Sequence, residues 1–222
     1  MLRWVTAIGL ATTLLWLAPS SATVTISISD GIHAVATCAD GAACDADPAH
    51  GSVKFVYVVG AWAGSVATGL SGAPVPVIDL KGSATSAGGG TLTMMVSDVD
   101  FALGATPGLH TFDGSVSGTE PGAGSSLGYS MWVDDANTLF GTTSLVDSGL
   151  TVSMPFAESV SGTAMTAGAF SMTLGVTVTH GGTGFTSFEF DPAVAAAPEP
   201  GTLALVGAAL AGLAALRRRR AR

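Results

Sequence analysis

The chain has 222 residues, of which 48% are hydrophobic and 11% are charged, and its formal net charge is −8. This length suits a single domain. The excess of acidic residues argues against nucleic acid and anionic membrane surfaces as partners, because both repel a negatively charged body.

The first predicted element is a secretory signal peptide at residues 1–22. It starts with one cation, Arg3, continues through an apolar stretch at residues 4–18, and ends in small residues before an expected cleavage after Ala22. These three features together define a signal for export. The alternative is a buried N-terminal helix, which is disfavoured because the apolar run has no polar face.

Residues 23–192 form the predicted ectodomain, and residues 193–197 are expected to be a linker, because small residues ahead of prolines make a poor strand. Within residues 23–197 only two cations, Lys54 and Lys81, stand against fifteen acidic residues, so this part has a formal charge of −13. We expect it to be soluble, with acidic side chains free to meet cations such as Ca²⁺.

The two cysteines, Cys38 and Cys44, lie in the segment CADGAAC. Export to an oxidising compartment favours a disulfide between them, and Asp40-Gly41 supplies a turn that brings the sulfurs together. A metal pair or a redox pair is the alternative. The spacing differs from C-x-x-C, and no nearby histidine completes a zinc site.

Alternation of apolar and polar residues predicts a series of strands along the ectodomain. The alternating apolar sets are, in chain order, Val24, Ile26 and Ile28; Leu92, Met94 and Val96; Leu127, Tyr129, Met131 and Val133; and Leu150, Val152 and Met154. Residues 52–60 are apolar on both faces after Lys54, as expected of a central strand.

The clearest strand is predicted at residues 170–180, with an inward-facing set made of Phe170, Met172, Leu174, Val176 and Val178. A glycine-rich loop follows at residues 181–184, and residues 185–190 place Phe188 and Phe190 on one face. Two strands joined by such a loop predict a hairpin that closes the domain.

Short strands separated by glycine and proline turns predict an all-β fold, an antiparallel β-sandwich. A barrel or a β-helix would also use short, evenly spaced strands. The absence of a fixed-period repeat counts against the β-helix.

Candidates for catalysis or metal binding are sparse. Ser126 is the centre of a G-x-S-x-G match, but the following residues predict a strand where a nucleophile elbow needs a helix. The four histidines, His33, His50, His110 and His180, have no metal-site spacing. No catalytic residue, metal ligand or cofactor is therefore predicted.

Two further sets of residues suit ligand binding. Asp98, Asp100, Asp134 and Asp135 could offer oxygen ligands to Ca²⁺, but they lack the spacing of an EF-hand, and solvated loops are the simpler explanation. Trp62 and Trp132 are able to stack on sugar rings, although each is also a natural core residue. Thr-x-Thr triplets at 23–25, 91–93 and 177–179 are too irregularly spaced for the ranks of an ice-binding solenoid.

The C-terminal tail combines three elements. Pro198-Glu199-Pro200 precedes an uncharged stretch at residues 201–216, which as a helix would be about 24 Å long, a marginal membrane anchor. Arg217, Arg218, Arg219, Arg220 and Arg222 follow and are expected to stay on the cytoplasmic side. This arrangement leaves the ectodomain outside and the tripeptide next to the membrane surface.

This tail resembles the PEP-CTERM sorting signal of Gram-negative bacteria. Pro198, Glu199 and Pro200 match its motif letter for letter, and Leu203-Ala204-Leu205 and the arginine block match its usual continuation. The resemblance implies recognition and cleavage by an exosortase, a membrane enzyme, and a link to extracellular polysaccharide and biofilm matrix. The same signature is also labelled as an ice-binding protein C-terminal region, which concerns the tail alone.

The ectodomain segments 130–142 and 168–190 are similar to all-β ectodomains of other PEP-CTERM proteins, a resemblance that implies no activity. The sequence thus favours an exported, non-enzymatic cell-surface or matrix protein that passes through the inner membrane. The alternatives are a secreted carbohydrate- or Ca²⁺-binding module and an exported hydrolase. A groove lined by Trp62 or Trp132 would favour the module. Two close carboxylates, or Ser126 beside a histidine, would favour the hydrolase.

Overall fold

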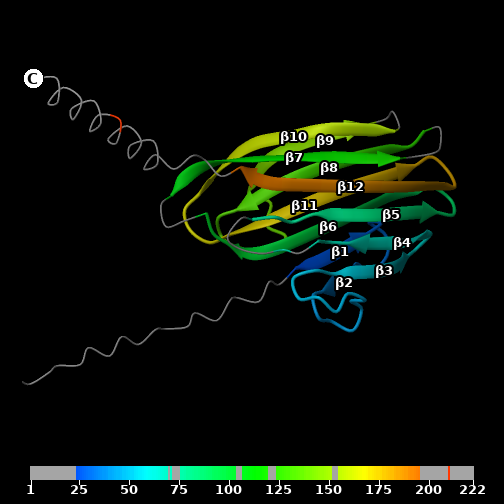
Figure 1. The fold of residues 1–222 in the computed structure, drawn as a ribbon. Coiled ribbons are helices and arrows are strands. Elements are labelled where there is room, and N and C mark those ends of the chain that lie inside the picture. Colours follow the sequence, from blue (N-terminus) through cyan, green and yellow to red (C-terminus); the bar gives the residue numbers. More distant parts are fainter. Residues whose placement is uncertain are drawn as a thin grey trace, which may run out of the picture.

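A computed structural model of the chain describes residues 24–69, 71, 76–103, 107–119, 124–151, 155–195 and 210. The described ectodomain is built from two six-stranded antiparallel sheets, and Figure 1 shows how they are arranged. Its strands are β1 (Thr25–Ser29), β2 (Ala36–Ala39), β3 (Lys54–Val59), β4 (Trp62–Ala67), β5 (Leu80–Ser86), β6 (Gly90–Phe101), β7 (Gly108–Thr119), β8 (Ser126–Asp134), β9 (Ser144–Thr151), β10 (Phe156–Thr166), β11 (Phe170–His180) and β12 (Gly184–Ala195).

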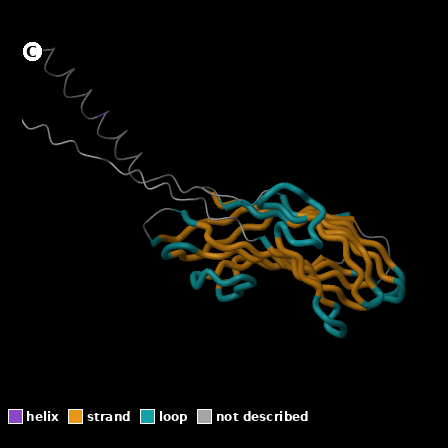
Figure 2. The backbone as a smooth tube through the Cα atoms, turned by 90° about the horizontal axis from the view of Figure 1, so that it is seen from below, coloured by secondary structure: helices purple, strands orange, loops and turns teal. Residues whose placement is uncertain are grey.

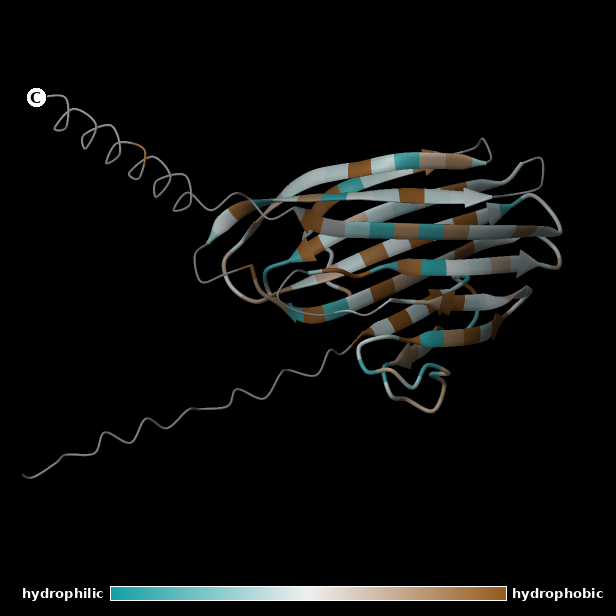
Figure 3. Ribbon diagram, viewed as in Figure 1, coloured by the Kyte–Doolittle hydropathy of each residue, from teal (hydrophilic) through white to brown (hydrophobic). Residues whose placement is uncertain are grey.

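Sheet A has the strand order β2-β1-β6-β11-β8-β9, and sheet B has the order β10-β7-β12-β5-β4-β3. Seen from below, most of the described chain is strand, and loops join the strands (Figure 2). Hydrophobic and hydrophilic residues alternate along strands such as β5 and β12 (Figure 3). The antiparallel sandwich predicted from the sequence is therefore confirmed.

The core lies between the inner faces of the two sheets. Phe112 of sheet B meets Phe170 of sheet A edge-on with ring centroids 6.3 Å apart, and Tyr129 of sheet A meets Phe190 of sheet B in the same way at 5.6 Å. Burying such large side chains contributes most of the stability of a sandwich. The predicted inward-facing sets of β1, β6, β8 and β11 are all buried.

The predicted closing hairpin is wrong, although both of its strands exist. β11 pairs with β6 and β8 in sheet A, whereas β12 pairs with β5 and β7 in sheet B, so the loop at 181–183 crosses between sheets. Residues from Phe170 to Val176 are buried on both faces of β11. Alternation identifies a strand locally, but it does not identify the strand's partner.

Two predictions about strand position are also wrong. Residues 52–60 were expected to form a central strand, but β3 is an edge strand of sheet B. Its Val56 and Val58 side chains are 66% and 77% exposed, whereas a central strand would bury them. In β9, Leu150 points to the outer face and is 68% exposed, while the next residue, Thr151, points inward and is buried. Residues 152–154, including Val152 and Met154, lie outside the described part of the chain.

The expected linker at 193–197 begins too early, because β12 continues to Ala195 by pairing with β7. Gly114 of β7 makes this possible. A Cβ atom at position 114 would lie 2.5 Å from the Cα of Pro192, so only glycine allows the two strands to approach this closely. The pairing of β12 with β5 ends at Phe190, so Pro192 interrupts no hydrogen bond on that side.

Candidate functional site

The predicted sorting residues lie outside the described part of the chain. This applies to Pro198, Glu199 and Pro200, to the arginines at 217–220 and 222, to Ala22, and to the apolar stretch at 201–216 apart from Leu210. Among the described residues, no helix has both the length and the hydrophobicity needed to cross a membrane.

The disulfide between Cys38 and Cys44 is present, with Cα atoms 5.8 Å apart. It joins β2, the edge strand of sheet A, to the loop that leads into β3. Asp45 fixes the same loop by accepting hydrogen bonds from the backbone N–H groups of Gly41, Asp47 and Lys54. The predicted disulfide is thus confirmed as a brace of this edge.

The two predicted acidic segments do meet in space. Asp100 and Asn137 exchange two hydrogen bonds, of 2.8 Å from the Asp100 N–H and 2.6 Å from the Asn137 side chain. Asp134 is buried and accepts hydrogen bonds from Thr143, Ala136 and Thr138. The hydroxyl of Thr143 contributes most to holding the pKa of Asp134 below its usual value.

Asp98 is also buried and accepts a hydrogen bond from Ser71, whereas Asp135 is exposed. Asp100 and Asp134 therefore position the loop between β8 and β9, whereas Asp98 holds Ser71, which lies between β4 and β5. Within the described ranges, no group of three or more His, Cys, Asp or Glu side chains is placed to hold a metal ion.

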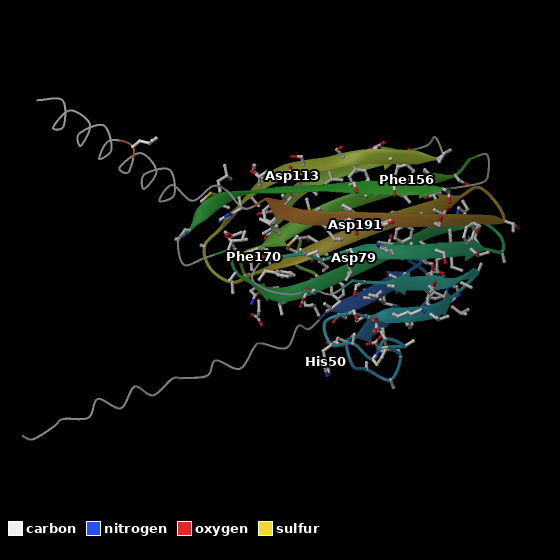
Figure 4. The ribbon with its side chains drawn as sticks, viewed as in Figure 1. His50, Asp79, Asp113, Phe156, Phe170 and Asp191 are labelled. Carbon is white, nitrogen blue, oxygen red and sulfur yellow. A yellow bond between two sulfur atoms is a disulfide. The ribbon has the colours of Figure 1, made fainter. Side chains whose placement is uncertain are left out.

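The four histidines have different environments. His33 bonds to Asp30, and His50 is exposed in the loop between β2 and β3 (Figure 4). Among the residues that the structure describes, the buried Nε2 atom of His110 has no hydrogen-bond partner. His180, at the end of β11, is buried between Ser86 and Thr186.

The contacts of His180 were not predicted, because they come from three strands. Its Nδ1 lies 2.7 Å from the Ser86 hydroxyl, its Nε2 lies 2.8 Å from the Thr186 hydroxyl, and its ring lies 4.9 Å from the ring of Trp62. Ser86 donates its proton to the carbonyl of Gly182, so Nδ1–H donates to Ser86 and Nε2 accepts from Thr186. Burial lowers the pKa of His180 and keeps this imidazole neutral.

The candidate groups for hydrolysis lie on separate strands of the ectodomain. Ser126 is the first residue of β8 and does not stand at a strand-to-helix turn. Ser86 does touch a histidine, but both are buried and brace the crossing between the sheets. Glu189 and Asp191 form a close carboxyl pair on the outer face of sheet B, beside Lys81.

Burial, together with the hydrogen bond and the negative charge of Glu189, raises the pKa of Asp191 to about 6. Lys81 instead holds the pKa of Glu189 below its usual value. Asp113, Asp191 and Asp79 lie on or beside strands of this sheet (Figure 4). Carboxyl groups in direct hydrogen-bond contact leave less room than either geometry used for glycoside hydrolysis.

The two tryptophans have different environments. Trp62 is 2% exposed and belongs to the core, where it packs against His180. Trp132 lies on the outer face of sheet A, because its neighbours Met131 and Val133 point inward. Its ring covers Gly175 of β11, where a Cβ atom would lie 2.9 Å from the indole carbon Cζ3.

A cavity of about 420 Å³ opens beside Trp132 on this face, and we call it the Trp132 trough. Its floor includes two glycines, Gly175 and Gly128. A Cβ built on Gly128 would lie 3.7 Å from its nearest neighbour, the carbonyl oxygen of Gly149, which is ordinary van der Waals contact, so a methyl group fits there without displacing anything. Six further lining residues bear hydroxyl or apolar groups: Thr93, Thr177, Ser130, Ser148, Met95 and Leu150.

Threonine pairs border the trough. Thr93 and Thr177 face each other across β6 and β11 with hydroxyl oxygens 3.4 Å apart, and the next pair, Thr91 and Thr179, lies at 3.2 Å. Two of the Thr-x-Thr triplets, separated in sequence, are therefore neighbours in the antiparallel sheet. The sequence offered no signal for this proximity.

Residues 196–220 match the family model of the PEP-CTERM protein-sorting motif. No match was found among the curated proteins or among the solved structures. The resemblance of the tail is thus confirmed. A PEP-CTERM motif is the recognition signal of an exosortase, so the chain is an exported protein of a Gram-negative bacterium that is sorted through its C-terminal tail.

Proposed function

We propose that this PEP-CTERM sorting-motif protein is a non-enzymatic component of the cell surface or the extracellular matrix. In this proposal an exosortase cleaves the chain near Pro198-Glu199-Pro200 after export, and the released ectodomain associates with extracellular polysaccharide. The match at residues 196–220 is the observation that carries the proposal. The ectodomain supports it, because its disulfide suits an oxidising compartment outside the cytoplasm.

The arrangement of the polar residues is consistent with a non-enzymatic role. Ser86, which is hydrogen-bonded to His180, is buried along with this partner. The close carboxyl pair, Glu189 and Asp191, lies on an open sheet face beside Lys81. These groups contribute to packing and to solubility.

A second candidate, the carbohydrate-binding module, is favoured by one observation. The Trp132 trough is the groove that the sequence interpretation required for such a module. Sugar-binding sites combine an aromatic surface with a few polar groups in a concave setting. This role is compatible with the first, because a matrix protein needs a means of holding polysaccharide.

The test replaces Pro198, Glu199 and Pro200 with alanines in a host that has an exosortase. We expect full-length protein to accumulate in the inner membrane, as measured by cell fractionation and C-terminal mass spectrometry. The unaltered chain in a host without exosortase is the matched control and should behave in the same way. Normal cleavage and normal surface delivery of the alanine variant would contradict the proposal.

A further inference from the structure

The outer face of sheet A differs in charge from the rest of the ectodomain. Every outward-facing side chain within 91–97 of β6, 126–132 of β8 and 173–179 of β11 is uncharged. Residues 23–197 nevertheless carry a formal charge of −13. A large uncharged face on such an acidic body has no cation to pair with an anionic ligand, and the surrounding charge repels one.

The chemistry of the trough is that of an apolar platform with a hydroxyl border. The indole of Trp132 lies over Gly175 and is partly exposed, so a flat apolar surface faces the cavity. Met95 and Leu150 add apolar walls, and Ser130 and Ser148 add hydroxyl groups. A pyranose ring has a matching structure, with an apolar C–H face and hydroxyl groups at its edge.

The hydroxyl border also extends beyond the cavity. Thr91 and Thr179 form the next pair along the sheet, and Ser126 of β8 is the register neighbour of Thr179. This extension suits a chain of sugars better than a single sugar, because successive residues can contact successive hydroxyl rows. Ordered water can bridge the longer contacts.

From these observations we propose that the Trp132 trough binds a neutral polysaccharide, with Trp132 as the stacking platform and the serine and threonine hydroxyls as the specificity-determining border. The inference rests on the proposed function as a matrix protein and names the ligand class of that role. Each further residue of the ligand would lie along the threonine rows of β6 and β11.

The experiment uses the exported protein recovered from the producing cells and the extracellular polysaccharide of the same cells, divided by anion exchange into neutral and anionic fractions. We expect binding to the neutral fraction that changes little with salt. Trp132→Ala should weaken it about tenfold or more, and Gly128→Leu should block it by filling the floor. Trp132→Phe should retain part of the binding, because a platform remains.

The matched control is Phe185→Ala, which removes an aromatic side chain, 44% exposed, from the other sheet. It should leave binding unchanged. Melting curves establish that each variant is folded. Failure of the unaltered protein to bind the neutral fraction, or equal binding by Trp132→Ala, would overturn the inference.

This result is separable from the test of sorting. If Trp132→Ala is cleaved and exported normally but does not bind, both the sorting proposal and the trough inference stand. If the unaltered protein is cleaved and exported but does not bind, only the trough inference fails. If the variant with alanines at Pro198, Glu199 and Pro200 is still processed normally, the sorting proposal fails whatever the trough binds.

Discussion

The outer faces of the two sheets are built on the same strand geometry but carry different chemistry. Sheet B presents charged residues to solvent, among them Lys54, Lys81, Glu189 and Asp191. The central strands of sheet A present serine, threonine and glycine around Trp132. The inner face of each sheet is constrained by the core, so only the outer faces are free to differ. We expect the charges of sheet B and the loops to maintain solubility, so that sheet A is free to contact the neutral ligand that we propose.

The largest expected effect separates the inner face of β11 from its outer face. Val176 is fully buried, so Val176→Asp places an unpaired charge in the core and should reduce the free energy of unfolding by about 4 kcal/mol or more. Thr177→Asp, on the outer face, should cost less than about 1 kcal/mol. Thermal melts of both variants measure this. Equal melting temperatures would mean that the outer face is not free surface.

The next effect concerns the edge of sheet A. The Cys38–Cys44 disulfide closes a short loop, so its reduction should lower the free energy of unfolding by about 2 kcal/mol. Intact-mass measurement after alkylation, with and without reductant, shows whether the bond exists in the exported protein. Two free thiols in protein recovered outside the cell would contradict the claim that a disulfide stabilises the β2 edge.

A smaller effect tests the floor of the trough with two glycines on the same face. Gly175→Ala should displace the Trp132 ring and lower stability by about 1 kcal/mol, because the new methyl group contacts the indole. Gly128→Ala makes only ordinary van der Waals contacts and should raise stability by about 0.5 kcal/mol, since alanine restricts the unfolded chain. Denaturant unfolding compares them. Identical stabilities would place the indole elsewhere.

The smallest effect lies on the outer face of sheet B. The pKa of Asp191 is raised to about 6, so the folded protein keeps this proton to a higher pH than the unfolded chain, where aspartate titrates near 4. Stability from this group therefore falls as pH rises from about 4 to 6. Asp191→Asn should give a small gain at pH 7.5, within the roughly 0.5 kcal/mol typical of surface sites, and no gain at pH 4. A gain of the same size at both pH values would contradict the assigned titration.

The sequence contains the inner faces of the sandwich but not the pairing of its strands. Phe170 to Val178 could be oriented correctly, because alternation along one strand is a local signal. The pairing partners of β11 and β12 could not be predicted, since β12, which follows β11 along the chain, belongs to the other sheet. β2, β4, β5, β7 and β10 were not predicted, because β2 is short and the serine-, threonine- and glycine-rich segments of the other four have weak alternation.

The candidate sites differ in the same way. The sorting tail is a contiguous motif, so its residues could be named from the sequence, and the family match confirms the motif. The Trp132 trough is assembled from four strands, with floor residues at 128 and 175. Trp132 was a candidate for sugar binding or for the core, and only the sheet registers place its ring on the outer face. Trp62 had the same two alternatives and proved to be core.

Hydroxyl-radical footprinting with the neutral polysaccharide fraction tests the contrast between the two faces most directly. Trp132 and Met95 report on the outer face of sheet A, and Met165 of β10, which is 57% exposed, reports on sheet B in the same sample. The account predicts that the polysaccharide slows the oxidation of Trp132 and Met95 and leaves that of Met165 unchanged. Protection of Met165 alone, or equal protection of all three side chains, would contradict it.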